Sequence, residues 1–194
     1  SQLFTSAGPK VIEELSMLGF EIFLDLKFHD IPNTVAQSVK AAANLGIWML
    51  NIHTSGGSIM MNEAKEATAE LLDPPLIIGV TMLTSLSEED VNEIGIQNIS
   101  NQALSLASLA KKNSLDGVVC SVNEVTRIKE LLGKDFITVT PGIRFSDSLK
   151  DDQSRVSTAR NAIENGSDYL VIGRPITQSD NPMNSLDSII QEIS

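Results

Sequence analysis

Opposite charges interrupt an apolar run near the start of the chain, in the segment Asp25-Leu26-Lys27-Phe28-His29-Asp30. If this run is a strand, the alternation of side chains places Asp25 and Lys27 on the same face. A buried charge without a partner costs several kcal/mol, so we expect these two side chains to pair with each other. The spacing alone is compatible with a catalytic pair and with a structural ion pair that closes the core.

A second group of candidates follows the last apolar run, at Gly173-Arg174-Pro175. The backbone N–H groups of such a turn, together with a guanidinium group, suit a phosphate dianion. Taken alone, three residues of these types are a weak signal. The same residues would be a strong signal for a phosphate site if they stood at the end of the final strand of a barrel, where phosphate sites are common.

The histidines and the cysteine give weaker signals. His53 could act as an acid or base, but a core histidine that bonds the backbone explains it at least as well. The chain has two histidines and one cysteine, Cys120, so neither a disulfide framework nor a metal cluster is expected. Cys120 lies in an apolar run, where a buried and unreactive thiol is the expected state.

The elements that carry these residues follow a regular rhythm of short apolar runs and longer amphipathic segments. The apolar runs cover residues 21–28, 47–53, 76–83, 117–121, 136–143 and 169–176. They are nearly continuous rather than alternating, which is typical of strands buried on both faces. Strands that alternate with helices predict a parallel sheet. No linker or change of composition interrupts residues 1–194, so one domain is expected.

About six strands are visible, and a helical pattern over residues 9–18 precedes the first of them. A doubly wound sheet can hold six strands, but it normally begins with a strand and a glycine-rich turn. A closed barrel needs eight strands. The pattern alone does not choose between the two folds.

Composition excludes some partners. The formal net charge of -11 would repel nucleic acid, and no cluster of Lys and Arg offsets it. No apolar run approaches the roughly 20 residues that cross a bilayer. We therefore expect no nucleic-acid partner and no membrane segment, and a cytoplasmic protein.

The block Asp25-Leu26-Lys27-Phe28-His29-Asp30-Ile31-Pro32-Asn33-Thr34 closely resembles the signature of the orotidine 5'-phosphate decarboxylases. Further segments resemble this family in the same order along the chain. They are Asn51-Ile52-His53-Thr54-Ser55-Gly56-Gly57, Gly79-Val80-Thr81-Met82-Leu83-Thr84-Ser85, Thr140-Pro141-Gly142-Ile143-Arg144, Asp152-Gln153-Ser154-Arg155 and Tyr169-Leu170-Val171-Ile172-Gly173-Arg174-Pro175-Ile176.

The resemblance implies a (β/α)8 TIM barrel whose first two strands are absent from this sequence. The segment Ser1-Gln2-Leu3-Phe4 resembles the residues that follow the second barrel strand, which in the family carries a further lysine. A barrel without two adjacent strands would expose two edges and an open core. We therefore expect residues to precede Ser1 in the natural polypeptide, and a fragment limited to these 194 residues to be inactive.

The resemblance also implies a function: decarboxylation of orotidine 5'-phosphate (OMP) to UMP without a metal or organic cofactor. Lys27, Asp25 and Asp30 match the family's catalytic positions. Asp30 and Thr34 match positions that reach the partner's active site in a homodimer, although Thr34 could instead be a helix N-cap.

The other positions that match the family's substrate contacts come from later segments. Pro141, Arg144 and Gln153 match the loop that closes over the phosphate, and a polar lid is expected over residues 146–154. Gly173 and Arg174 match the phosphate cradle. Thr84 or Ser85 matches the contact to the pyrimidine edge, and the sequence does not decide between them.

Two other readings stay open. Magnesium-dependent relatives, such as a hexulose-phosphate synthase, share Asp-x-Lys-x-x-Asp but resemble the chain less over residues 28–34 and at Gln153. A barrel that binds phosphate without catalysis is the other alternative. The joint presence of Asp25, Lys27, Asp30, Gln153 and Arg174 argues against a barrel without catalytic activity.

Overall fold

A computed structural model describes residues 2–145 and 156–194. The chain divides into two compact units. Unit 1 comprises Ser1–Val80 and Ser108–Gly117, and unit 2 comprises Thr81–Ala107 and Val118–Ser194. One domain over residues 1–194 stays a prediction.

Unit 1 holds three parallel strands in chain order, β1 (Phe23–Phe28), β2 (Met49–His53) and β3 (Leu76–Val80). The β2–β3 ladder is regular over its whole length. Most residues of β2 and β3 are buried, which explains their continuous apolar sequence. The carboxyl ends of the three strands therefore meet at one edge, and β1 brings Asp25 and Lys27 toward it.

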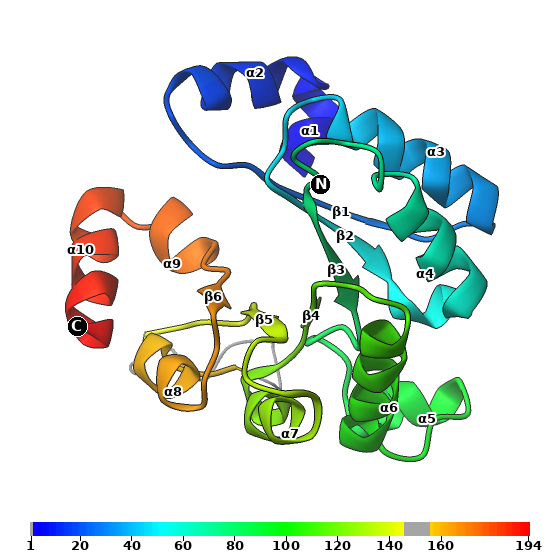
Figure 1. Cartoon of the computed structure of the whole chain (residues 1–194). Coiled ribbons are helices and arrows are strands. Elements are labelled where there is room, and N and C mark those ends of the chain that lie inside the picture. Colours follow the sequence, from blue (N-terminus) through cyan, green and yellow to red (C-terminus); the bar gives the residue numbers. More distant parts are fainter. Residues whose placement is uncertain (1, 146–155) are drawn as a thin grey trace. The chain divides into compact units, whose positions relative to one another are not determined.

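Two helices of unit 1 precede β1, and the other helical segments connect its strands. They are α1 (Gln2–Ala7), α2 (Lys10–Met17), α3 (Pro32–Ala43), the 3-10 turn η1 (Thr54–Gly56) and α4 (Gly57–Glu66). Helix α3 begins with Pro32 at its first turn and buries Val35 and Val39. Helix α3, drawn in light blue in Figure 1, and helix α4, drawn in cyan, pack side by side.

Unit 2 holds most of β4 (Gly117–Val119), together with β5 (Ile137–Thr140) and β6 (Tyr169–Leu170), again in chain order. Its helices are α5 (Glu88–Glu93), the first part of α6 (Ile99–Lys112), α7 (Val122–Leu132), α8 (Ala159–Glu164), α9 (Arg174–Thr177) and α10 (Pro182–Ile193). Thr158 caps α8 by accepting a hydrogen bond from the Asn161 N–H. Cys120 is buried, as predicted.

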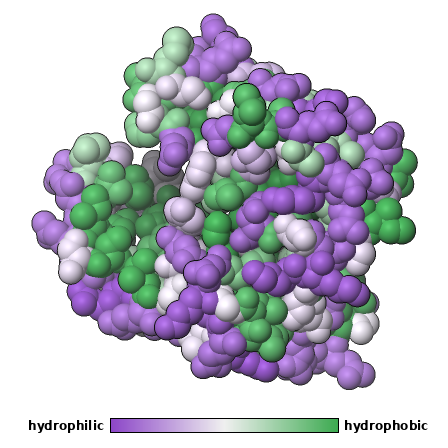
Figure 2. All heavy atoms as spheres, viewed as in Figure 1, coloured by the Kyte–Doolittle hydropathy of each residue, from purple (hydrophilic) through white to green (hydrophobic). Residues whose placement is uncertain are grey.

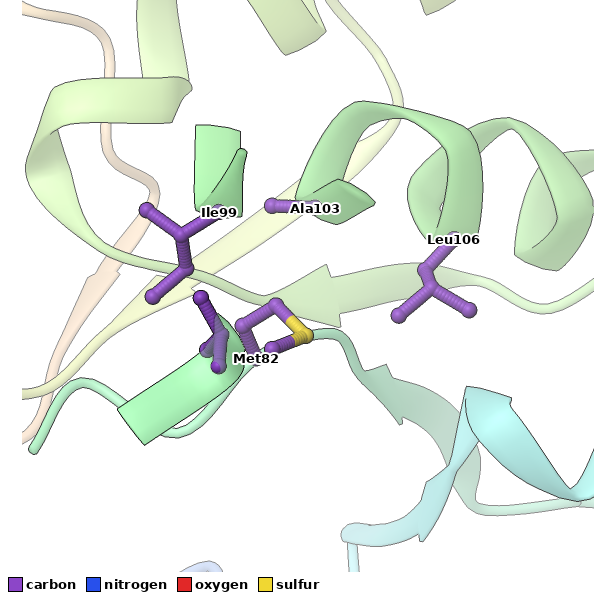
Figure 3. Close-up of a cluster of buried hydrophobic side chains, with 5 residues drawn as sticks. Met82, Ile99, Ala103 and Leu106 are labelled. Atoms are coloured by element: carbon purple, nitrogen blue, oxygen red, sulfur yellow. The ribbon is translucent and has the colours of Figure 1, made fainter. Parts of the chain in front are cut away.

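A cluster of apolar side chains fixes the segment that follows β3. Met82 packs with Ile99, Ala103 and Leu106 of α6 (Figure 3), and Val91 of α5 completes the cluster. These five side chains are buried. The cluster therefore anchors the turn that begins directly after Met82.

Several strands end earlier than the sequence predicts. Strand β3 ends at Val80 instead of residue 83, and β6 ends at Leu170 instead of residue 176. The apolar run continues because some residues beyond the strand are still buried or partly buried. Ile172 and Ile176, for example, pack against the core of unit 2 although they lie outside β6. An apolar run therefore marks residues that pack against the core, but it does not give the length of the strand.

An aspartate directly before a strand joins three elements in unit 1. Asp116, which precedes β4, accepts hydrogen bonds from Lys65 of α4 at 2.7 and 2.8 Å. It also accepts the N–H of Ile77 in β3 at 2.8 Å, while its own N–H donates to the Ile77 carbonyl. The side chain therefore ties a helix to the amino ends of two strands.

Unit 2 repeats this arrangement with Asp168, which precedes β6. Asp168 accepts hydrogen bonds from Lys129 of α7 and from the N–H of Thr138 in β5, both at 2.6 Å. Its own N–H donates to the Thr138 carbonyl. The same three-element bridge therefore occurs once in each unit, at the end of the strands remote from the candidate site residues.

Helix α10 also exposes an apolar stripe. Met183, Leu186, Ile190 and Ile193 are exposed, whereas Ile189 is buried. Figure 2 shows apolar atoms gathered on the face of unit 2 that carries this helix. Within the described residues, no helix is long and apolar enough to cross a membrane.

Candidate active site

Asp25 and Lys27 form an ion pair near the carboxyl end of β1. The Lys27 Nζ lies 2.6 Å from Asp25 Oδ1, and each side chain keeps about a third of its surface exposed, 36% and 37%. The prediction that these side chains lie together is confirmed. The pair is accessible to a ligand, because neither side chain is buried.

Strand β1 is irregular where it carries this pair. Its register with β2 shifts between Leu24 and Phe28, and Lys27 has a φ of 54°. A left-handed conformation costs a residue with a side chain about 1–2 kcal/mol. Simple alternation along a strand, on which the sequence argument relied, is therefore not the geometry that brings Lys27 to Asp25. Strain of this size at a charged pair is typical of functional sites.

Asn51 of β2 connects both members of the pair, and sequence reasoning did not select it. Its Oδ1 accepts the Lys27 backbone N–H at 2.8 Å, and its Nδ2 donates to Asp25 Oδ1 at 2.6 Å. The available signal was a polar residue within the apolar run of β2. A polar residue in an apolar run does not by itself indicate what it contacts, and its partners Lys27 and Asp25 lie 24 and 26 residues away in the sequence.

The surroundings of Asp25 keep its carboxylate ionised. Burial alone would raise the pKa of Asp25, but hydrogen bonds from Lys27 and Asn51 and the charge of Lys27 lower that pKa below its ordinary value. The site therefore holds an anion and a cation side by side at neutral pH.

Two histidines lie close to this pair. The ring centroids of His29 and His53 are 5.2 Å apart. Burial lowers the pKa of His53, the nearby His29 and Lys27 lower it further, and Asp25 opposes them. His53 is therefore neutral at neutral pH. Within residues 2–145 and 156–194, no cluster of three or more His, Cys, Asp or Glu side chains is arranged to hold a metal ion.

Asp30 and Thr34 lie beyond the pair, at the start of α3. Asp30 is exposed and accepts the Ile31 N–H at 2.7 Å. Thr34 is exposed inside α3, whose N-cap is Ile31, so the alternative in which Thr34 caps the helix is wrong. Pro32 explains the shift, because proline favours the first helical turn and thereby places the helix start before Thr34.

In unit 2, Thr84 and Ser85 follow the cluster around Met82. They lie in a turn after the end of β3, not at a strand end as predicted. Thr84 is half-buried and Ser85 is exposed. Thr81, the residue directly after β3, donates both its N–H and its hydroxyl to the Val119 carbonyl.

The predicted phosphate residues in unit 2 gather where β5 and β6 end. Thr140 pairs with Leu170, and the Val171 N–H donates to the Thr140 carbonyl at 2.9 Å. Pro141 therefore follows one strand beside the segment that leads to Gly173. Gly173 is the exposed N-cap of α9, and the half-buried Arg174 is its first residue.

Arg144 occupies a different setting. It is buried, and its Nη1 donates to the Ile143 carbonyl at 2.8 Å. Its backbone N–H bonds the Ser157 carbonyl. Gln153 and the predicted lid over residues 146–154 lie outside the described residues.

Comparisons with known proteins agree with this architecture. Orotidine 5'-phosphate decarboxylases from Saccharophagus degradans and Teredinibacter turnerae are 53% and 52% identical to the chain over 194 and 193 residues. The alignments cover 100% and 99% of this chain, and 82% and 83% of those proteins. The crystal structure of orotidine 5'-phosphate decarboxylase from Lactobacillus acidophilus superposes with a TM-score of 0.83 at 41% identity. This superposition covers 98% of the present chain and 83% of the Lactobacillus acidophilus chain.

The parallel strand–helix units and this superposition define a protein of the (β/α)8-barrel class, of which the chain contributes six strands among its described residues. Residues 1–189 match the orotidine 5'-phosphate decarboxylase / HUMPS family. The chain belongs to that family.

Proposed function

We propose that the protein decarboxylates OMP to UMP, with the Asp25–Lys27 pair as the reacting centre and without a metal or organic cofactor. Family membership and about 50% identity to proteins named orotidine 5'-phosphate decarboxylase support the reaction. The observation that carries the assignment of the centre is the 2.6 Å ion pair on the distorted end of β1.

The reaction needs positive charge beside C6 of the pyrimidine. When the bond from C6 to the carboxylate breaks, CO2 leaves and the electron pair stays on C6. No ring carbonyl is placed to delocalise that pair, so a fixed cation must stabilise it. Lys27 supplies the cation, and its ammonium group then gives a proton to C6 to form UMP.

Asp25 has two roles in this proposal. Its carboxylate holds the Lys27 ammonium group in place through the 2.6 Å hydrogen bond. It also presents negative charge to the substrate carboxylate, which favours departure of that group as neutral CO2. The lowered pKa of Asp25 supports this role, because only the ionised form can act in this way.

The functional unit in this proposal is a homodimer with shared active sites. Asp30 and Thr34 are exposed, and among the described residues Asp30 makes no hydrogen bond to Asp25 or Lys27. These features suit residues that complete the site of a partner subunit. In a dimer with two-fold symmetry, each subunit would contribute its Asp30 and Thr34 to the active site of the other subunit.

The substrate phosphate is assigned to unit 2. Gly173 and Arg174 begin α9 and offer backbone N–H groups with a guanidinium group. Pro141, Arg144 and Gln153 are assigned to the loop that closes over the phosphate. Of Thr84 and Ser85, we assign the pyrimidine contact to Thr84, because it is half-buried in a turn that the Met82 cluster anchors.

The proposal also covers the partners of the protein and its cellular compartment. A net charge of -11 argues against nucleic acid as a partner. The buried single thiol and the nucleotide substrate suit a cytoplasmic enzyme.

The experiment uses the full-length polypeptide with OMP and follows UMP formation by absorbance. EDTA is added in one arm, and hexulose 6-phosphate replaces OMP in another, because the family also includes HUMPS proteins. We expect OMP turnover that EDTA does not change. Loss of turnover with EDTA, or reaction of the sugar phosphate alone, would contradict the proposal.

A further inference from the structure

Asn51 is a buried polar side chain placed between two strands. It lies in the middle of β2 with 1% of its surface exposed. Its backbone is paired with β3 opposite Ile78, so the residue is held firmly. Its side chain is directed to β1, where it contacts the two residues of the ion pair.

The contact to Lys27 is made to the backbone. At the register shift between Leu24 and Phe28, the β1–β2 ladder is interrupted. The Lys27 N–H donates instead to Asn51 Oδ1 at 2.8 Å, and Lys27 has the left-handed φ of 54°. The Asn51 side chain thus replaces a ladder bond and satisfies the N–H in the conformation from which Lys27 reaches Asp25.

The contact to Asp25 is made to one carboxylate oxygen. Asn51 Nδ2 and Lys27 Nζ both donate to Asp25 Oδ1, each at 2.6 Å. Among the described residues, Oδ2 accepts no hydrogen bond. Two donors on one oxygen fix the rotation of the carboxylate and leave the other oxygen available to a ligand.

We propose that Asn51 is the positioning residue of this centre: it sets the backbone of Lys27 and the carboxylate of Asp25 through one side chain. The inference rests on the roles proposed above for Asp25 and Lys27. Asn51 does not itself react. It acts through the two charged residues that it joins.

The principal variant is Asn51→Leu, which keeps the approximate volume and removes both hydrogen bonds. We expect single-turnover decarboxylation to slow by about 100-fold, the loss typical of a catalytic group displaced by about 1 Å. UMP affinity should change much less, because the buried side chain is assigned no contact with the nucleotide.

A pH profile separates positioning from a general loss of structure. Without the Asn51 donor, the pKa of Asp25 rises, so the acid limb of the single-turnover rate should move to higher pH. Among the described residues, Lys27 and His53 interact electrostatically with Asp25, and His29 lies beside His53; the substitution leaves all three unchanged. Amide hydrogen exchange gives a second readout, since the Lys27 N–H should be protected in the wild type and lose protection in Asn51→Leu.

Asn113→Leu is the matched control. Asn113 is also a buried asparagine of unit 1, and its Nδ2 donates to Ser58 Oγ and to the Leu109 carbonyl. This variant loses comparable hydrogen bonds without touching Asp25 or Lys27. Its acid limb and its Lys27 amide protection should match the wild type.

Asn51→Asp keeps the test decisive if Asn51→Leu does not fold. It preserves the shape and the acceptor for the Lys27 N–H, but it replaces the donor by a carboxylate facing Asp25. Two adjacent carboxylates raise one pKa, so the acid limb should again move to higher pH while Lys27 stays protected from exchange.

The outcomes distinguish this inference from the proposed function. An unshifted acid limb and a rate within about threefold of wild type in Asn51→Leu or Asn51→Asp overturn the positioning role alone. If Lys27→Ala itself keeps the wild-type rate, the proposed centre fails, and the role of Asn51 fails with it.

Discussion

Asp168 offers a direct test of how the strands of unit 2 are held. Its carboxylate accepts the Thr138 N–H at 2.6 Å, the Thr138 hydroxyl at 3.0 Å and Lys129 Nζ at 2.6 Å. The Lys129 side chain is only 12% exposed, so little water can replace its partner. Asp168→Ala removes all three contacts at once.

The magnitude follows from these contacts. A hydrogen bond to a charged group contributes about 1.5–3 kcal/mol, and removal of one member of a buried ion pair costs about 3–5 kcal/mol. Two features reduce the sum. Asp168 is 36% exposed, and Lys129 keeps bonds to the carbonyls of Lys134 and Phe136. We therefore expect the free energy of unfolding to fall by about 3 kcal/mol.

Urea unfolding of the full-length protein, followed by circular dichroism, measures this change. Asp168→Asn keeps an acceptor for Thr138 and should cost about 1–2 kcal/mol. Asp187→Ala, on the exposed face of α10, should change the stability by less than about 0.5 kcal/mol. If Asp168→Ala is no less stable than Asp187→Ala, the bridge does not hold the strands.

Three further predictions concern the site. A 1:1 mixture of inactive Lys27→Ala and Asp30→Ala subunits should recover about a quarter of wild-type activity, because half the dimers are mixed and each has one intact site; no recovery despite demonstrated heterodimers means self-contained subunits. Arg174→Ala should severely slow the phosphorylated substrate and hardly affect the phosphate-free nucleoside, since phosphate binding energy raises the rate; equal fractional losses would contradict the assignment. Because the pKa of Asp25 is lowered in the folded protein, its ionised carboxylate contributes stability that is complete above its ordinary pKa of 3.8 and is lost as pH falls through the folded pKa. The difference in unfolding free energy between wild type and Asp25→Asn should therefore shrink in acid. A difference that does not depend on pH would refute this contribution.

Much of the fold followed from the sequence. Nearly continuous apolar runs predicted parallel strands, and the described residues contain six of them in the expected places. Strand ends were predicted poorly because apolar residues continue to pack against the core beyond the ends of the strands. Ile176, for example, is apolar because it packs in the core, although it lies in α9 and not in β6.

The site was predictable where the residues were neighbours in sequence. Asp25 and Lys27 were expected to pair, and they do. The distortion that brings them together was not, because the φ of 54° at Lys27 depends on a side chain from another strand. Asn51 could not be predicted from the sequence, because it contacts Asp25 and Lys27 only when β1 and β2 lie side by side in the fold.

The central claim is that Lys27 stabilises and protonates the C6 carbanion while Asp25 holds it in place. Single-turnover decarboxylation of OMP by full-length Lys27→Ala tests this most directly, with circular dichroism to confirm folding and UMP binding to confirm an intact site. Loss of one charge from a preorganised site costs about 3–4 kcal/mol, or several hundredfold in rate, and loss of the proton donor adds to it. We expect a folded protein that binds UMP and has lost nearly all decarboxylation, whereas a near-normal rate from this variant would contradict the mechanism.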